Sequence, residues 1–259
     1  MKAKWISSPV AANDHVLYRF KKTVSIDETK DITVHISADS RYKLYINNMY
    51  VCEGPCIGTL KYYDEVHIEN YIQKGDNTIE AVVLYAGGLG LSCIQRKNRV
   101  AFIMEAFHDG KTLFFTDESW ECALDKSTIF YMSKYIHING YPNEVYKYDE
   151  PKWQSAVIPP FVSGSEIWGV LPWYDLNKNP LKPYTPSKGI PMKISRTDIK
   201  NGMKVKKGGR GYVIFGLDKL SVGFPEFELS VPTFSKTVIR LKFLTILSVR
   251  IKYTTKFGT

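Results

Sequence analysis

The stretch from residue 36 to residue 66 constrains the fold of this chain more than any other. Apolar and polar side chains alternate from Tyr42 to Ile46, which is the period of a strand with one buried face. Asn47 and Asn48 follow, and asparagine tolerates the left-handed backbone that a two-residue hairpin turn requires. Residues 38–40 predict a polar turn before this strand. The pattern therefore predicts a β-hairpin within an antiparallel sheet.

Short strands of the same kind fill the rest of the first half of the chain. They are predicted at residues 16–26, 31–36, 62–68, 78–85, 100–107, 112–115 and 117–122, with turns at 74–77 and 108–111. No segment keeps the 3.6-residue period of an amphipathic helix. The sequence therefore predicts an all-β fold, a jelly roll or β-sandwich, with Leu44 and Trp120 in its core.

The composition changes between Pro151 and Pro191, where eight of the 13 prolines lie. Proline has no amide hydrogen to give to a sheet, so this passage is predicted to be an extended connector rather than sheet. Beyond it, residues 211–216 and 223–229 begin a second β unit. We predict three regions: residues 1–170 as an N-terminal β-sandwich, 171–192 as the proline-rich connector, and 193–259 as a partial second β-sandwich.

The charge distribution argues against a nucleic-acid partner. The net charge is +9, and residues 190–259 carry +10 of it while residues 1–189 carry −1. The lysines lie between strand-like apolar residues, as is typical of the solvent-exposed faces of strands. The sequence predicts neither a recognition helix nor exposed aromatic residues interleaved with the lysines. No apolar run approaches the roughly 20 residues of a membrane span, so no membrane partner is expected. No secretory signal is visible, which suits an intracellular protein or one whose signal has been removed.

No cofactor is predicted. The four cysteines, Cys52, Cys56, Cys93 and Cys122, lack the paired spacing of a zinc site and are expected to be buried free thiols. The histidines show no metal-binding spacing either. Calcium stays open, because carboxylates alone do not reveal it.

Several passages together resemble the N-terminal β-sandwich region of bacterial α-L-rhamnosidases, family 78 of the glycoside hydrolases. In chain order they are the hairpin YKLYINN at 42–48, NEVY at 143–146 with PKWQSA at 151–156, LPWY at 171–174 leading to Ile190–Pro191, and FGLD at 215–218 leading to Gly223. They cover roughly residues 4–232, and Lys147 stands where the family commonly has Asp. The resemblance implies a galactose-binding-like sandwich followed by the start of a second.

The same resemblance places hydrolysis outside this chain. In the family an inverting pair of carboxylates works in a downstream (α/α)6 barrel, and no segment here could supply its helices. Residues 236–259 are strand-prone, contain no acidic residue and do not complete a second sandwich, which suits an early stop, a frameshift or a chosen boundary. We therefore assign no catalytic residue and expect a missing downstream catalytic domain as a partner.

Aromatic rings beside polar side chains are candidates for binding a carbohydrate, in this family a rhamnose-containing glycan. The candidates are Asp39, Arg41, Tyr63 and Asp64 around the hairpin, and Trp168, Trp173 and Tyr174 in the proline-rich passage. Each of them could instead be a packing residue. The predicted function is a non-catalytic portion of an α-L-rhamnosidase-like hydrolase that supports the catalytic domain and binds sugar. The alternatives are a stand-alone lectin-like module and a small glycosidase hidden in the sandwich.

Overall fold

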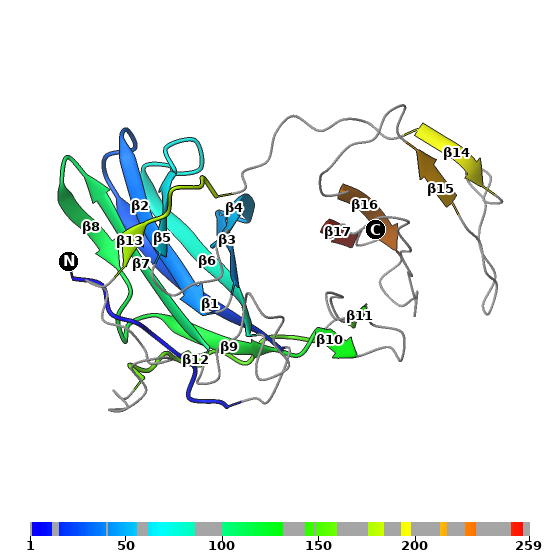
Figure 1. The fold of residues 1–259 in the computed structure, drawn as a ribbon, viewed down its shortest axis with the longest axis horizontal. Coiled ribbons are helices and arrows are strands. Elements are labelled where there is room, and N and C mark those ends of the chain that lie inside the picture. The colour runs from blue at the N-terminus through cyan, green and yellow to red at the C-terminus, as the bar shows by residue number, and fades with distance from the viewer. Residues whose placement is uncertain are drawn as a thin grey trace. The chain divides into compact units, whose positions relative to one another are not determined.

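The computed structural model divides the chain into two compact units, residues 1–187 and 188–259. It describes residues 2–11, 16–39, 41–55, 62–85, 100–131, 143–147, 149–159, 176–183, 193–197, 213–216, 226–231 and 250–255. Every regular element among these residues is a β-strand, so the predicted all-β class is confirmed (Figure 1). No helix in this part of the chain is long and apolar enough to cross a membrane.

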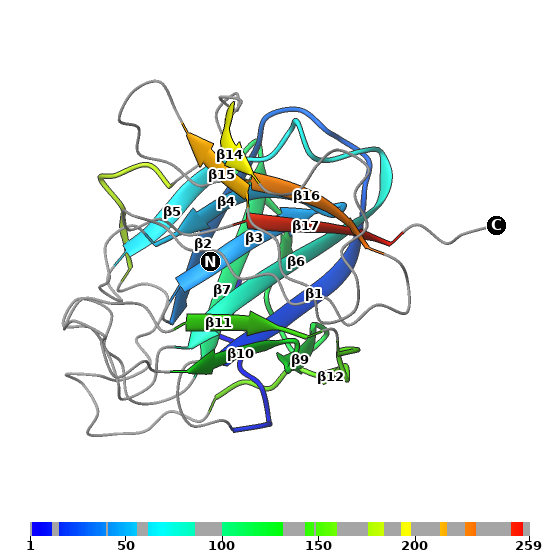
Figure 2. The ribbon, with the colours of Figure 1, turned by 90° about the vertical axis from the view of Figure 1, so that its right-hand side faces the viewer.

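The first unit contains a sandwich of two sheets and a separate antiparallel pair, β10 (Thr128–Tyr131) with β11 (Asn143–Tyr146). The six-stranded sheet has the order β12-β9-β1-β6-β3-β4 (Figure 2). Its strands are β12 (Gln154–Ser155), β9 (Glu121–Asp125), β1 (Val16–Ile26), β6 (Gly75–Tyr85), β3 (Arg41–Ile46) and β4 (Met49–Gly54). The five-stranded sheet has the order β13-β5-β2-β7-β8. Its strands are β13 (Asn177–Lys178), β5 (Tyr62–His67), β2 (Ile32–Asp39), β7 (Ala101–His108) and β8 (Lys111–Phe115).

The predicted hairpin is β3 and β4, and its turn residues Asn47 and Asn48 have φ values of 51° and 62°. Asp109 and Gly110 likewise have positive φ in the turn between β7 and β8. The polar turn predicted at residues 38–40 is wrong at its start, because β2 continues through Asp39. The chain then passes from the five-stranded sheet to the six-stranded one, since β3 pairs with β6 and not with β2.

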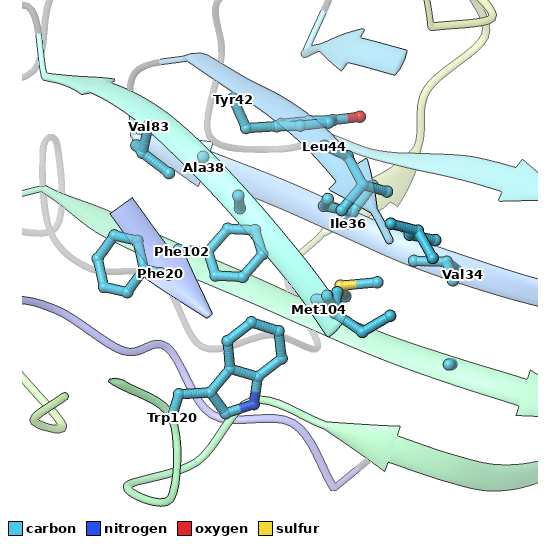
Figure 3. Close-up of a cluster of buried hydrophobic side chains, with 14 of the residues drawn as sticks. Phe20, Val34, Ile36, Ala38, Tyr42, Leu44, Val83, Phe102, Met104 and Trp120 are labelled. Carbon is cyan, nitrogen blue, oxygen red and sulfur yellow. The ribbon is translucent and has the colours of Figure 1, made fainter. Parts of the chain in front are cut away.

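The main core lies between the two sheets and consists of the inward side chains of both (Figure 3). Alternation along each strand supplies them: Tyr42, Leu44 and Ile46 point inward from β3. Trp120 belongs to the same core, and its ring contacts that of Phe102 edge-on at a centroid distance of 5.6 Å. Leu44 and Trp120 are both 0% exposed, as the sequence predicted for core residues.

A smaller apolar cluster lies on the other face of the five-stranded sheet. It consists of Ala3, Trp5, Ala101, Ile103 and Leu176. The N-terminal segment reaches this sheet because Ile6 pairs with Phe102 of β7, and Ser7 then pairs with Val157 near β12. Because Ile6 faces the main core, its neighbour Trp5 faces the outside of the sheet. This outer face is therefore partly covered rather than fully wet.

Part of the proline-rich passage joins the sheet, contrary to the prediction of a pure connector. Strand β12 pairs with β9, and β13 pairs in parallel with β5 at the edge of the five-stranded sheet. Pairing is possible because the prolines flank these two-residue strands and leave their amides available. We call residues 176–183 the strap, since they lie along the β5 edge.

The second unit contains two strand pairs among its described residues. Strands β14 (Lys193–Thr197) and β15 (Val213–Gly216) are antiparallel, while β16 (Glu226–Val231) and β17 (Arg250–Thr255) are parallel. Strands predicted from residues 211–216, 223–229 and 236–259 thus have counterparts here. The region boundaries at 170/171 and 192/193 stay a prediction.

Candidate functional site

The candidate site is the outer face of the five-stranded sheet, where strands β13, β5, β2 and β7 meet. Residues 62–65 are the start of strand β5, where the sequence predicted a strand, so consecutive side chains point to opposite faces. Tyr63 and Glu65 point to the outer face, whereas Asp64 points inward and is 0% exposed. The strand period therefore separates residues that adjoin in sequence into a surface group and a buried group.

An aromatic row crosses the centre of this outer face. The ring centroid of His35 lies 4.4 Å from that of Tyr63 and 4.9 Å from that of Phe107. All three side chains are half-buried, and Tyr63 also packs against the small apolar cluster beside it. Three strands thus hold a row of rings that remains partly open to solvent.

Charged groups border the aromatic row on the strap side. The Nζ atom of Lys178 donates to Oε1 of Glu65 at 2.7 Å, and Nε2 of His35 lies 3.5 Å from Oε2 of the same carboxylate. The hydrogen bond from Lys178 is the main cause that lowers the pKa of Glu65. The same contact raises the pKa of Lys178. Glu65 is therefore anionic at neutral pH, and its side chain is partly exposed to solvent.

The imidazole of His35 has one nitrogen without a partner. Its Nδ1 atom is buried and makes no hydrogen bond, while Nε2 faces Glu65. Burial lowers the pKa of His35, and the neighbouring carboxylate of Glu65 acts in the opposite direction. The neutral ring is thus favoured at neutral pH. A neutral imidazole that carries its proton on Nε2 can donate to Glu65 and leaves the buried Nδ1 as an unfilled acceptor inside the protein.

Glu105 pairs with His35 across the strands but is engaged inside the protein. Its carboxylate is fully buried and accepts from the backbone amides of Lys2 and Ala3 at 3.1–3.3 Å and from Oγ1 of Thr112 at 2.8 Å. This carboxylate therefore anchors the N-terminal segment onto the sheet, and its lone pairs are already occupied.

Asp64 belongs to a second, buried arrangement directly behind the site. Its Oδ2 atom accepts from the hydroxyl of Tyr42 at 2.6 Å, and its Oδ1 atom accepts from Nδ2 of Asn179 at 2.7 Å. Burial raises the pKa of Asp64 above its ordinary value, although both hydrogen bonds act in the opposite direction. Burial likewise raises the pKa of Tyr42 well above its usual range. A β3 side chain, a β5 side chain and the strap are thereby joined.

The structure separates the residues that the sequence grouped around the hairpin. Tyr63 lies on the candidate site. Asp64 lies behind it, with both carboxylate oxygens bonded within the protein. Asp39 is 6% exposed at the end of β2, and Arg41 begins β3 in the other sheet. Trp168, Trp173 and Tyr174 lie outside the described residues.

Four residues of the site were not among the candidates from sequence: His35, Glu65, Phe107 and Lys178. The alternation Ile32, Val34, Ile36 already assigned His35 to the solvent-exposed face of its strand. Phe107 gave no such signal, because the sequence of β7 does not alternate and its first six residues are all buried. Lys178 gave no comparable signal, because nothing in a proline-rich passage predicts a two-residue parallel pairing. Within the described residues no group of three or more His, Cys, Asp or Glu side chains could hold a metal ion.

We expect the Asp64→Asn variant to lose part of the pH dependence of stability. The raised pKa of Asp64 means that the folded protein binds this proton more readily than the unfolded chain does. The resulting contribution to the free energy of unfolding is fully present below the unfolded value near 3.8 and is lost as the pH rises through the folded pKa. Asparagine keeps an acceptor for Asn179 and supplies a donor for Tyr42, but it does not titrate.

Urea unfolding of both proteins between pH 4 and pH 8 measures this effect. The free energy of unfolding of Asp64→Asn minus that of the wild type should be largest at neutral pH and should decrease as the pH falls. Glu65→Gln is the control with the opposite sign. The lowered pKa of Glu65 gives stability that is present above its unfolded value and lost on acidification. Parallel profiles for wild type and Asp64→Asn would contradict the prediction.

Comparison with known proteins bears on the fold. No family model and no curated protein sequence matches the chain. Among solved structures, a family 78 rhamnosidase of Bacillus sp. GL1 matches with a TM-score of 0.56 and 24% identity over 69% of this chain. This match spans 20% of the rhamnosidase chain. It shows that this chain shares a β-sandwich fold with part of that enzyme.

Two further matches are more distant. An α-L-rhamnosidase of Dictyoglomus thermophilum has a TM-score of 0.41 and 19% identity, and covers 76% of this chain and 23% of its own. A lectin of Pleurotus ostreatus in complex with GalNAc has a TM-score of 0.40 and 16% identity, and covers 60% of this chain and 42% of its own. At these scores neither match adds to the statement on the fold.

Proposed function

We propose that this chain is a non-catalytic sandwich region of an α-L-rhamnosidase-like glycoside hydrolase, and that the outer face of its five-stranded sheet binds carbohydrate. The observation that carries the proposal is the half-exposed row of Tyr63, His35 and Phe107 bordered by the Glu65–Lys178 ion pair. The ordered motifs between residues 4 and 232 and the fold shared with the Bacillus rhamnosidase support the family part.

The chemistry of the face suits a sugar. A pyranose presents an apolar face of C–H groups and a rim of hydroxyls, so a binding surface needs rings for the former and oriented polar groups for the latter. Tyr63 and His35 supply the rings. Glu65 accepts hydrogen bonds from hydroxyl groups, and Lys178 donates hydrogen bonds to hydroxyl oxygens. Both charges are already paired, which favours a neutral sugar over an anionic one.

The arrangement of carboxylates supports a binding role over hydrolysis. Glycoside hydrolysis needs two carboxyl groups that face the bond to be cleaved, one of which is a proton donor with a raised pKa. Of the two glutamates beside His35, Glu65 has a lowered pKa and Glu105 is occupied by backbone amides. Asp64 has a raised pKa but faces the interior. The described residues of this face thus lack an acid and a base that could act together.

A stand-alone lectin-like module is the second candidate. It is favoured by one observation: every residue of the candidate site lies within the first compact unit, between His35 and Lys178. Such a site needs no catalytic domain to be complete. The two candidates differ in their expected selectivity among sugars. A supporting domain of a rhamnosidase favours L-rhamnose over other sugars only where it forms part of the substrate path.

We expect Tyr63→Ala to weaken sugar binding at least about tenfold, because it removes the ring that packs on His35 and on the apolar cluster. Tyr45→Ala is the matched control, since Tyr45 is also half-buried but lies on the six-stranded sheet, in edge contact with Tyr50. Isothermal titration of the full chain with L-rhamnose, a rhamnoside and galactose measures the affinities, and rhamnoside cleavage is followed in the same samples.

The results test the proposed site and the non-catalytic assignment. Saturable binding that is lost in Tyr63→Ala and kept in Tyr45→Ala supports the proposed site. Cleavage of the rhamnoside would overturn the non-catalytic assignment. Equal losses in both variants would place the binding surface elsewhere or indicate a general loss of folding, which the melting temperatures distinguish.

A further inference from the structure

We propose that the strap, residues 176–183, is an integral part of the candidate site, and that Asn179 is the positioning residue that places Lys178 on Glu65. This inference rests on the proposed carbohydrate-binding function. It extends that function by assigning a role to a buried group that the sugar does not touch. The argument starts from the contrast between how Lys178 and its neighbour Asn179 are held.

Lys178 is poorly fixed by its own contacts. Its side chain is 57% exposed, and its ion pair with Glu65 is a surface interaction. Such a pair gains little free energy in water and must order a long flexible side chain. The ion pair therefore cannot by itself hold the strap against the sheet edge. The 2.7 Å distance between Nζ of Lys178 and Oε1 of Glu65 requires that the strap backbone is already held in place.

Asn179 supplies this fixed backbone. It is 6% exposed, and its backbone amide, Nδ2 atom and Oδ1 atom each make a hydrogen bond. Its backbone amide donates to the carbonyl oxygen of Tyr63 at 2.8 Å, and its Nδ2 atom donates to Asp64 at 2.7 Å. Its Oδ1 atom accepts from the amide of Leu181 at 3.1 Å. One side chain thus ties the strap both to β5 and to its own following turn.

Leu176 provides the second anchor, on the other side of Lys178. It is 8% exposed and belongs to the small apolar cluster against which Tyr63 packs. Anchors at positions 176 and 179 bracket the two exposed residues between them, Asn177 and Lys178. The strap therefore buries Leu176 and Asn179 and presents Lys178 at the border of the aromatic row.

Asp64 and Tyr42 extend the anchor into the sandwich. The Tyr42 hydroxyl holds the second oxygen of the Asp64 carboxylate at 2.6 Å, so the acceptor for Asn179 is itself fixed. A hydrogen bond to a charged acceptor is stronger than one between neutral groups. The position of Lys178 on the surface is thus set by a chain of contacts that runs from β3 through β5 to the strap.

A double-mutant cycle on the full chain tests this inference. Lys178→Met removes the ammonium and keeps the stem, and Asn179→Ala removes the anchor. We expect each change to weaken sugar binding about five- to tenfold, and the double variant to be no weaker than either, because both remove the same contact. Asn177→Ala is the matched control, since Asn177 is an exposed asparagine on the same strand, and it should leave the affinity unchanged.

A second readout does not depend on sugar. Lys178 is the main cause of the lowered pKa of Glu65, so this pKa, followed by carbon NMR, reports whether Lys178 is in place. We expect it to rise by the same amount in Asn179→Ala and in Lys178→Met. Asn179→Ser provides a milder variant if Asn179→Ala folds poorly, and it should give an intermediate rise.

The two readouts separate the possible failures. If the wild type binds no sugar, the proposed function fails, and the pKa of Glu65 still decides whether Asn179 positions Lys178. An unchanged Glu65 pKa in Asn179→Ala would overturn the positioning role. Additive losses of affinity in the double variant would overturn it as well, because the two residues would then act independently.

Discussion

Replacement of Trp120 by alanine should cost about 3–5 kcal/mol of unfolding free energy, one of the two largest losses we expect from any single change in the first unit. Trp120 is 0% exposed, and its ring meets Phe102 edge-on in the main core. Its Nε1 atom donates to the carbonyl oxygen of Phe115 at 2.9 Å. Alanine would leave a large cavity and a buried carbonyl without its donor.

Urea unfolding of the two proteins measures this loss. For a unit of this size the melting temperature should fall by roughly 6–20 °C, given about 2–4 °C for each kcal/mol. Trp120→Phe is the control, since it keeps a ring against Phe102 and loses mainly the hydrogen bond, so its cost should be clearly smaller. A loss below about 1 kcal/mol in Trp120→Ala would mean that the core does not depend on this ring.

The core that surrounds Trp120 could be predicted from sequence because one simple rule generates it. Alternation along residues 42–46 and along 32–36 identifies which side chains face inward, and each of the predicted inward residues is buried. Asn47 and Asn48 identified the hairpin turn through backbone conformation alone. These features are local, so a single strand or turn carries the whole signal.

The candidate site could be predicted only in part, because its residues meet through strand pairing. Tyr63 was recognised as a ring beside polar groups, but its assumed companion Asp64 points to the opposite face of β5. His35 lies beside Tyr63 because β2 pairs with β5. Lys178 lies beside Glu65 because β13 also pairs with β5. Which strands become neighbours depends on the packing of the entire sandwich, and no short sequence pattern encodes it.

The hydrogen bonds of Asp64 illustrate the same limit. In sequence, Asp64 lies between a tyrosine and a glutamate and has the character of a surface residue. In the fold, partners 22 and 115 residues away in the chain satisfy both of its oxygens. A buried carboxylate is stable only with such partners, and their contribution becomes visible only when the three strands are in place.

Replacement of Gly54 by alanine should be the other severe change, with a loss of roughly 2–5 kcal/mol, because the added methyl group has no space. An ideal Cβ atom at this position would lie 2.0 Å from Oδ2 of Asp64 and 2.9 Å from the hydroxyl oxygen of Tyr42. Either the carboxylate or the strand must move, and both movements break the buried bond between Asp64 and Tyr42. The loss therefore combines steric strain with an unsatisfied buried polar group.

Two comparisons make this expectation specific. Gly110→Ala is the control glycine: its φ is +71° and nothing lies within 4 Å of an added Cβ, so it should lose only the backbone term of about 1–2 kcal/mol. Gly54→Ala combined with Asp64→Ala removes the obstructing carboxylate, so the double variant should be less destabilised than the sum of the two single variants. Full additivity would mean that the methyl group and the carboxylate do not compete for the same space. If the collision is real, Gly54→Ala should also raise the pKa of Glu65, because displacement of Asp64 would release Asn179 and with it Lys178.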